Sequence, residues 1–332
     1  MIFPNWCPMN SRLKKFLCLL LAFFALFGAL RLYFRLTDDF RISNITYDLP
    51  FTPPWKAPNI TPDEHRELAT IFKQKFSYIG KGAQCYAFVS ENGQYVLKFF
   101  KFKHLRPNLF VDLLPNIPPF QEFKQKSIAR KQHRLIGVFN GYDLAFRENR
   151  DTAALIYLQL VPNPDLHLTA TVIDKLGLTR NIQLDHIVFL LQKKGDTLRH
   201  RLHQYLSHEQ LNDAKDAVTS IIAMYISEYK KGIYDHDHGI LHNTGFIGNV
   251  PFHLDVGKLN KDDRMQQSDI YKSDLEHVLW KIDAWVKANY PAYYPEFTKF
   301  LAQQYYLQTH ETLDLSSVDP KRFRKQRKLL GF

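Results

Sequence analysis

The chain has 332 residues, a formal net charge of +11 and 45% hydrophobic residues, and 14% of its residues are aromatic. This length and apolar content suffice for one large domain or two well-buried lobes, which excludes a mostly disordered protein. The 3 cysteines are too few for a disulfide framework and have no metal-binding spacing. The basic excess is compatible with three kinds of partner: nucleic acid, anionic lipid or phosphate-bearing ligands.

The N-terminus carries an uncharged apolar run, FLCLLLAFFALFGAL, over residues 16–30, with basic residues on both sides. As a helix this run rises about 22 Å, short of a bilayer core of about 30 Å, unless Arg31 snorkels and the run continues. No small-residue cleavage motif precedes Arg31. We therefore expect a basic segment over 1–15 and an uncleaved single-pass membrane anchor over 16–36, rather than a removed signal peptide. The flanking charges leave the topology open.

Five prolines mark the next stretch, residues 37–65, which we interpret as a linker before a compact region that begins near His65. Two β-like runs between Phe76 and Phe102 flank Asn92-Gly93, which is a strong hairpin signal.

The following elements are expected in chain order. Residues 123–160 are predicted to be helical with a break near Asn140-Gly141, and further strands are predicted at 169–172 and 187–191. An apolar helical stripe runs from Leu211 to Lys230 and ends at Gly232, a natural C-cap. Strands followed by helices indicate an α+β fold.

Two features near the first strands suit phosphate binding. Gly80 and Gly82 lack the Cβ atoms that would keep phosphate oxygens away from the backbone. Lys98 lies in a β-like run between Leu97 and Phe99, so its side chain points away from theirs. The alternatives are an ordinary strand turn and a lysine on the solvent face of an edge strand.

Oxygen-bearing side chains gather further along the chain. Residues 235–243 read DHDHGILHN, and Asp255 follows an apolar stretch twelve residues after Asn243, with Gly257 next but one. Carboxylate and amide oxygens suit a hard cation such as Mg²⁺ bound together with nucleotide phosphates. An aspartate such as Asp237 can orient an acceptor hydroxyl and take its proton.

These pieces, in this order, resemble motifs of the protein-kinase-like superfamily. Gly80 and Gly82 match the first two glycines of G-x-G-x-x-G, while Cys85 replaces the third. The run containing Lys98 is similar to the V-A-I-K strand, and Asp255 begins a segment that resembles D-F-G.

The catalytic loop departs from the family pattern. Asp237 takes the position of the aspartate of H-R-D, with Asp235 and His236 in place of the histidine and arginine. Asn243 lies six positions after Asp237 rather than five, so the loop is one residue longer than the pattern. A segment that resembles the S-D-V-W start of the central helix follows Asp255 with no A-P-E between them, which favours an atypical kinase or a small-molecule phosphotransferase similar to the aminoglycoside phosphotransferase class.

The resemblance implies a two-lobed fold, with an N-lobe over 66–192 and a C-lobe over 193–320. The basic run at the C-terminus separately predicts a solvated tail over 321–332. The resemblance also implies ATP and Mg²⁺ as cofactors. The implied roles are nucleotide binding by Gly80, Gly82, Lys98 and Glu148, metal binding by Asn243 and Asp255, and catalysis by Asp237. Glu148 is chosen over Glu122 as the carboxylate that holds Lys98.

The expected function is a membrane-anchored phosphotransferase that uses ATP with Mg²⁺ and acts on a small-molecule or protein acceptor that the sequence does not identify. An active domain would face the cytosol, where ATP is available. Three alternatives stay open: a pseudokinase that binds nucleotide or a protein partner without turnover, a non-kinase membrane protein that binds lipid or polymer, and a Zn²⁺ or Fe site in the 235–242 cluster. Nucleic acid is not an expected partner.

Overall fold

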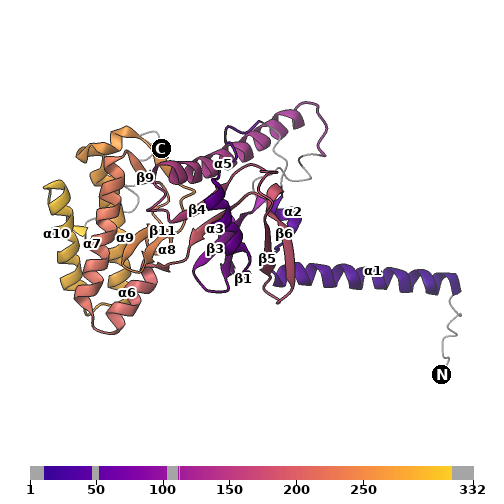
Figure 1. The fold of residues 1–332 in the computed structure, drawn as a ribbon, viewed down its shortest axis with the longest axis horizontal. Coiled ribbons are helices and arrows are strands. Elements are labelled where there is room, and N and C mark those ends of the chain that lie inside the picture. Colours follow the sequence, from indigo (N-terminus) through magenta and orange to yellow (C-terminus); the bar gives the residue numbers. More distant parts are fainter. Residues whose placement is uncertain (1–10, 47–51, 103–110, 112, 316–332) are drawn as a thin grey trace, which may run out of the picture.

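The computed structural model describes residues 11–46, 52–102, 111 and 113–315. A strand-rich region is followed by a helix-rich region, and one helix projects from the strand-rich end as an isolated rod (Figure 1). The molecule is therefore a mixed α and β fold built around a curled sheet, as the order of predicted strands and helices indicated. The predicted basic tail over 321–332 lies outside the described residues.

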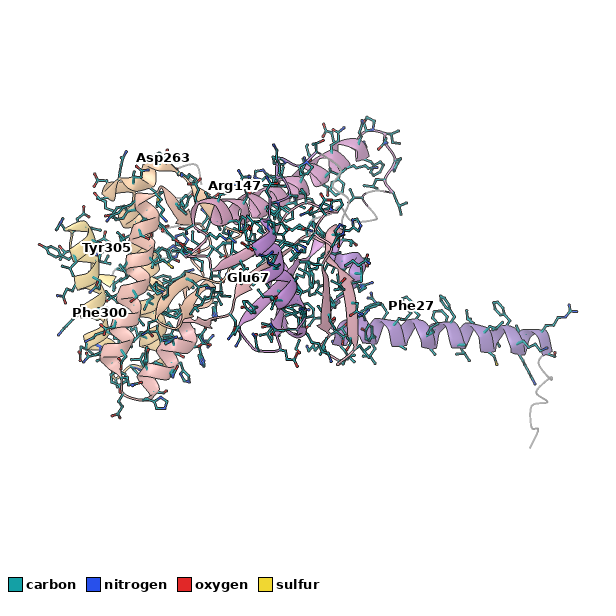
Figure 2. All side chains as sticks on the ribbon, in the orientation of Figure 1. Phe27, Glu67, Arg147, Asp263, Phe300 and Tyr305 are labelled. Carbon is teal, nitrogen blue, oxygen red and sulfur yellow. The ribbon has the colours of Figure 1, made fainter. Side chains whose placement is uncertain are left out.

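The projecting helix is α1 (Ser11–Leu36), and none of its residues is buried. Its side chains, Phe27 among them, stand away from the body of the molecule (Figure 2). Within the described residues it is the one helix long and apolar enough to cross a membrane. Membrane anchors and N-terminal signal sequences share this length and composition.

Part of the predicted linker over 37–65 instead belongs to the folded body. Phe40 is buried, and its ring lies 5.3 Å from that of Tyr86 and 4.9 Å from that of Phe88. Trp55 is buried against Phe139. Burying such aromatic side chains outweighs the proline-rich composition that suggested a flexible connection. The segment also holds α2 (Ile42–Ile45) and leads into α3 (Pro62–Phe72).

Seven described strands form one sheet in the order β4-β7-β3-β2-β1-β5-β6. Its strands are β1 (Lys75–Lys81), β2 (Cys85–Ser90), β3 (Tyr95–Phe100), β4 (Leu155–Gln159), β5 (Thr169–Ile173), β6 (Thr179–Gln183) and β7 (Phe189–Lys193). The predicted hairpin joins β2 and β3, where Gly93 has the positive φ of 71° that favours glycine. β5 pairs with β1 in parallel and carries β6 on its far side.

Helix α5 (Phe120–Glu148) links the two regions, running from the sheet to the start of the helix-rich part (Figure 1). It passes through Asn140-Gly141 without the predicted break and ends at Glu148, so the helix predicted over 123–160 is too long. Gly141 lies where α5 packs closely against another part of the chain, since a Cβ there would lie 2.7 Å from the carbonyl oxygen of Val256. The helix presses on this segment because glycine leaves room for it.

The helix-rich region has its own core. Its helices are α6 (Leu198–Ser207), α7 (Leu211–Lys230), α8 (Ile240–Asn243), α9 (Ser268–Asn289) and α10 (Tyr294–Thr309). Its short strands are β8 (Asp196–Thr197), β9 (Ile233–Asp235), β10 (Thr244–Ile247), β11 (Val250–His253) and β12 (Leu259–Lys261). The bounds of α7 are those predicted.

Apolar side chains from residues 198–315 form one cluster, and those from residues 40–191 form another. A third cluster joins α5 to residues near the Asp255 segment. The polar side chains of interest lie on elements that meet near this third cluster.

Candidate functional site

Lys98 projects from β3 toward the segment that follows β11. Its Nζ donates to Oε1 of Gln192 at 2.8 Å and to the carbonyl oxygen of Leu254 at 2.5 Å. Burial lowers the pKa of Lys98, and the nearby Asp255 carboxylate opposes that effect. The ammonium group thus lies next to the residue predicted to bind metal, rather than on a solvent face.

Gln192 is a site residue that the sequence did not reveal. It lies on β7, beside β3, and its amide donates to the carbonyl oxygens of Ala153 at 2.6 Å and His253 at 2.8 Å. Its side-chain oxygen then faces Lys98. A glutamine in an otherwise apolar strand was the available signal, since a buried amide has to find hydrogen-bond partners.

Asn243 and Asp255 are brought together by the backbone. The carbonyl oxygen of Asn243 accepts from the backbone nitrogen of Leu254 at 2.7 Å. Oδ1 of Asp255 accepts from the backbone nitrogen of Gly257 at 3.1 Å and from the hydroxyl of Tyr142 at 3.0 Å. The structure thus places the two predicted metal ligands beside the predicted phosphate-binding lysine.

Tyr142 is a second residue that the sequence analysis missed. It lies on the buried face of α5, and burial raises its pKa well above the usual range, so its hydroxyl stays protonated and donates to Asp255. Tyrosine on an apolar helix face looks like core in a sequence, and only the fold shows what its hydroxyl contacts.

Asp237 lies on the exposed side of the same loop. Its Oδ2 accepts from Nδ2 of Asn243 at 3.2 Å, and its backbone nitrogen donates to Oδ1 of Asp235 at 2.8 Å. Asn243 ends the short helix α8, and its amide reaches back to Asp237. The predicted catalytic and metal-binding side chains are therefore neighbours despite the altered spacing.

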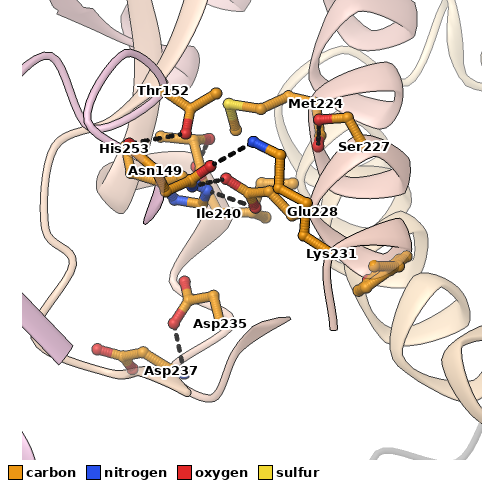
Figure 3. Close-up of polar contacts among 12 residues, drawn as sticks. Asn149, Thr152, Met224, Ser227, Glu228, Lys231, Asp235, Asp237, Ile240 and His253 are labelled. Carbon is orange, nitrogen blue, oxygen red and sulfur yellow. Dashed lines mark hydrogen bonds and ion pairs between the residues drawn. The ribbon is translucent and has the colours of Figure 1, made fainter. Parts of the chain in front are cut away.

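A network of polar side chains (Figure 3) adjoins the end of this loop, where His253 pairs with Thr244 across strands β10 and β11. Nε2 of His253 contacts Oε2 of Glu228 at 3.0 Å, Nδ2 of Asn149 donates to Oε1 of Glu228 at 2.5 Å, and Lys231 donates to Asn149 at 3.2 Å. Burial alone would lower the pKa of His253, but Glu228 outweighs it and the pKa is raised.

The loop is also braced by α9. Asp274 accepts from the hydroxyl of Tyr229 at 2.6 Å and pairs with the buried ring of His238, and Lys281 donates to the carbonyl oxygen of His238 at 2.6 Å. The aspartate of the S-D-V-W-like segment thus contacts the loop through a histidine side chain.

Asp235 makes the unfolding free energy depend on pH. Its carboxyl is buried, and burial raises its pKa from 3.8 to about 6. The folded state therefore holds this proton more tightly than the unfolded state, so the contribution of Asp235 to stability is largest below about pH 4 and is lost as pH rises through about 6. We expect Asp235→Asn to remove a drop of about 2–3 kcal/mol. Urea unfolding at several pH values measures it, with exposed Asp269→Asn as control. Parallel pH profiles for wild type and Asp235→Asn would contradict the prediction.

The glycine-rich turn lies at the β1–β2 junction. The backbone nitrogen of Gly82 donates to the carbonyl oxygen of Cys85 at 2.9 Å, and Nζ of Lys101 donates to the carbonyl oxygen of Gly82. A Cβ at Gly80 or Gly82 would meet no atom within 4 Å, so the space above both glycines is open. A phosphate group has room to approach this backbone.

The assignment of Glu148 as the partner of Lys98 is corrected. Glu148 ends α5 and forms an ion pair with Lys261 near the surface, and Glu122 pairs with Lys126. Gln192 and the carbonyl oxygen of Leu254 serve Lys98 instead. Glu148 is the last residue of α5, and its carboxylate is partly exposed to solvent rather than turned toward Lys98.

Among the described residues no group of three or more His, Cys, Asp or Glu side chains is placed to hold a metal ion. The 235–242 cluster is divided between the buried contacts of Asp235 and His238 and the exposed side chain of Asp237. This division gives no support to direct Zn²⁺ or Fe ligation. Asn243 and Asp255 carry amide and carboxylate oxygens of the type that Mg²⁺ prefers, an ion that completes its shell with water and substrate phosphates.

No protein-family model matches the chain, and no curated protein matches its sequence. Similar solved structures include WbdD in a co-crystal with the kinase inhibitor LY294002, with a TM-score of 0.34 and 13% identity over 76% of this chain and 50% of that chain. Another, of the bifunctional kinase-methyltransferase WbdD, has a TM-score of 0.32 and 13% identity over 74% of this chain and 47% of that chain. The chain spans about half the length of these structures.

Proposed function

We propose that this chain is a kinase-like phosphotransferase that uses ATP with Mg²⁺ and is held at a membrane by α1. The observation that carries the proposal is the meeting of one buried ammonium group, on Lys98, with the oxygen-bearing residues Asn243 and Asp255. They come from separate elements of a two-region fold, and open space lies above the glycine turn that precedes them. This set suits a triphosphate and its divalent ion.

Each group has a distinct task in the proposed reaction. Lys98 pairs with phosphate oxygens, Asn243 and Asp255 hold Mg²⁺, and Gly80 and Gly82 offer backbone to the phosphates. ATP supplies the transferable phosphoryl group. Because phosphoryl transfer requires little covalent help from protein, preorganised charge is expected to give most of the rate enhancement.

Asp237 is the proposed base. It orients the acceptor hydroxyl and accepts its proton as the phosphoryl group moves. A cavity between α5 and the loop is our candidate for the acceptor site. It is lined by His133, Arg134, His236 and Lys258 among others, and His236 precedes Asp237 in the chain. Its basic lining favours acceptors that carry negative charge.

Two measurements on the full chain in detergent test the proposal: the thermal shift produced by ATP with Mg²⁺, and release of phosphate from ATP in the absence of an acceptor. We expect the wild type to show both, and Asp237→Asn to keep the thermal shift and lose turnover. Exposed Asp213→Asn is the matched control and should behave as wild type. Turnover unchanged in Asp237→Asn would remove this residue from the catalytic role.

A second candidate, nucleotide binding without turnover, is favoured by one observation. The side chains of Asp237 and Asn243 hydrogen bond to each other, so each engages a polar group of the other that the proposed reaction would use. On this reading the wild type gives the thermal shift, and no phosphate is released above the level of Asp237→Asn. Absence of any thermal shift would reject both candidates and favour a membrane protein that binds lipid or polymer.

A further inference from the structure

The end of α1 is fixed to the sheet rather than joined to it by a free tether. The hydroxyl of Tyr33, in the last turn of α1, donates to Oδ2 of Asp174 at 2.7 Å. Asp38, just beyond the helix, accepts from Lys175 at 3.1 Å and from Tyr78 at 3.0 Å. Asp38 and Asp39 both have positive φ, at 56° and 66°, so the chain turns sharply here before Phe40 enters the core.

The contacts converge on the loop between β5 and β6, which we call the β5–β6 turn (residues 174–178). β5 and β6 lie across the axis of α1, at its end (Figure 1). Asp174 is buried, and its Oδ1 accepts from the backbone nitrogens of Leu176 at 2.9 Å and Leu178 at 3.0 Å. The carboxylate therefore organises the turn internally while its other oxygen receives the Tyr33 hydroxyl.

This rigid turn presents two leucines to the outside. Leu176 is 48% exposed and Leu178 is 53% exposed. A single exposed leucine requires no explanation, but two on one ordered turn beside an apolar helix form a local apolar surface. Lys175 lies between Asp174 and Leu176, with a side chain that is 52% exposed. Leucine next to exposed lysine suits the boundary between acyl chains and anionic headgroups.

The position of Tyr33 sets the depth of the turn. The apolar run of α1 ends at Leu30, and Arg31, Tyr33 and Arg35 follow it. Tyrosine and arginine at the end of an apolar run favour the membrane–water interface. Asp174 hydrogen bonds to the Tyr33 hydroxyl, so the β5–β6 turn lies at the same depth as Tyr33, at the membrane–water interface.

We propose that the β5–β6 turn is a second membrane contact, in which Leu176 and Leu178 enter the lipid interface beside α1. The partner is the lipid bilayer itself. Together, α1 and the β5–β6 turn would fix the orientation of the sheet region on the membrane. A single helix would leave that region free to tilt. This inference rests on the part of the proposed function that keeps α1 in the membrane, and it does not depend on phosphotransfer.

Fluorescence quenching of the full chain in vesicles tests this contact. The vesicles consist of phosphatidylcholine and phosphatidylglycerol with acyl chains brominated close to the headgroup. We expect Leu178→Trp to add emission that is blue-shifted and quenched by the brominated lipid, relative to the wild-type background. Leu176→Trp is an independent second variant. The matched control is Leu307→Trp on α10, at the far end of the molecule, where the residue is 55% exposed.

Equal quenching at 176, 178 and 307 would overturn the proposal. A second result would also overturn it: no quenching in vesicles, together with protection of the turn from solvent in native membranes. That pattern indicates a protein partner. A native chain that lacks residues 11–36 and is absent from membranes would overturn the anchor and this contact together. Loss of ATP binding with quenching retained would remove the proposed phosphotransferase activity and leave the membrane contact standing.

Discussion

If the proposed function is right, replacing Asp255 by asparagine is expected to lower Mg²⁺-dependent ATP turnover by at least about 100-fold, since it removes the charge of the proposed metal ligand. Asparagine keeps the shape of the side chain, and its oxygen can still accept from Tyr142 and from the backbone of Gly257. The fold should therefore survive while the charge is lost. Phosphate release and the thermal shift with ATP and Mg²⁺ measure the two consequences.

Two comparisons make the Asp255 result specific. Asp269→Asn changes an exposed carboxylate that pairs with Lys272, and it should leave turnover unchanged. Varying the Mg²⁺ concentration separates loss of metal binding from a general defect, because a weakened site should recover part of its activity at high Mg²⁺. An Asp255→Asn protein with the metal dependence of the wild type would show that the ion is held elsewhere.

The second large effect is expected in stability. Glu228→Ala should lower the free energy of unfolding by about 3–5 kcal/mol, because it leaves buried His253 and Asn149 without their partner. All three are buried and contact one another in the polar network next to the loop over residues 235–243. Urea unfolding of the full chain in detergent, followed by circular dichroism, measures the change.

Matched variants separate charge from packing at this site. Glu228→Gln keeps oxygen and nitrogen atoms that can bond to His253 and Asn149, so it should cost less than Glu228→Ala. Glu296→Ala breaks an exposed pair with Lys215 and should cost less than about 1 kcal/mol. If Glu228→Ala were no more harmful than Glu296→Ala, the buried network would not be important to the fold.

The sequence predicted elements with strong periodicity better than it predicted tertiary contacts. The stripe from Leu211 to Lys230 is an observed helix with the same bounds, and the Asn92-Gly93 turn joins two strands as expected. The region from 149 to 160 was placed in a helix because β4, buried in the sheet, has an apolar run too short to distinguish from helix. Local composition likewise concealed the packing of Phe40 and Trp55.

The candidate site shows the same division. The sequence indicates Gly80, Gly82 and Lys98 as candidates, because residue type and order within a strand carry that signal, and their roles stay predictions. It does not indicate the partner of Lys98, since Gln192 reaches it from a strand 94 residues further along, and Glu148 was preferred on helix position alone. Tyr142 was missed for a similar reason. A hydroxyl on a buried helix face acquires a role only when folding brings another chain segment against it.

The close approach at Gly141 has a mechanical consequence. Backbone meets backbone where α5 crosses Val256, and Gly257 is equally confined, since a Cβ there would lie 2.3 Å from Oε1 of Gln84 and 3.0 Å from the ring of Tyr142. No compressible side chain separates the helix from the Asp255 segment, so the two must travel as one body. Motion relative to this unit is therefore expected at the turn between β1 and β2, where a Cβ on Gly80 or Gly82 would meet no atom within 4 Å.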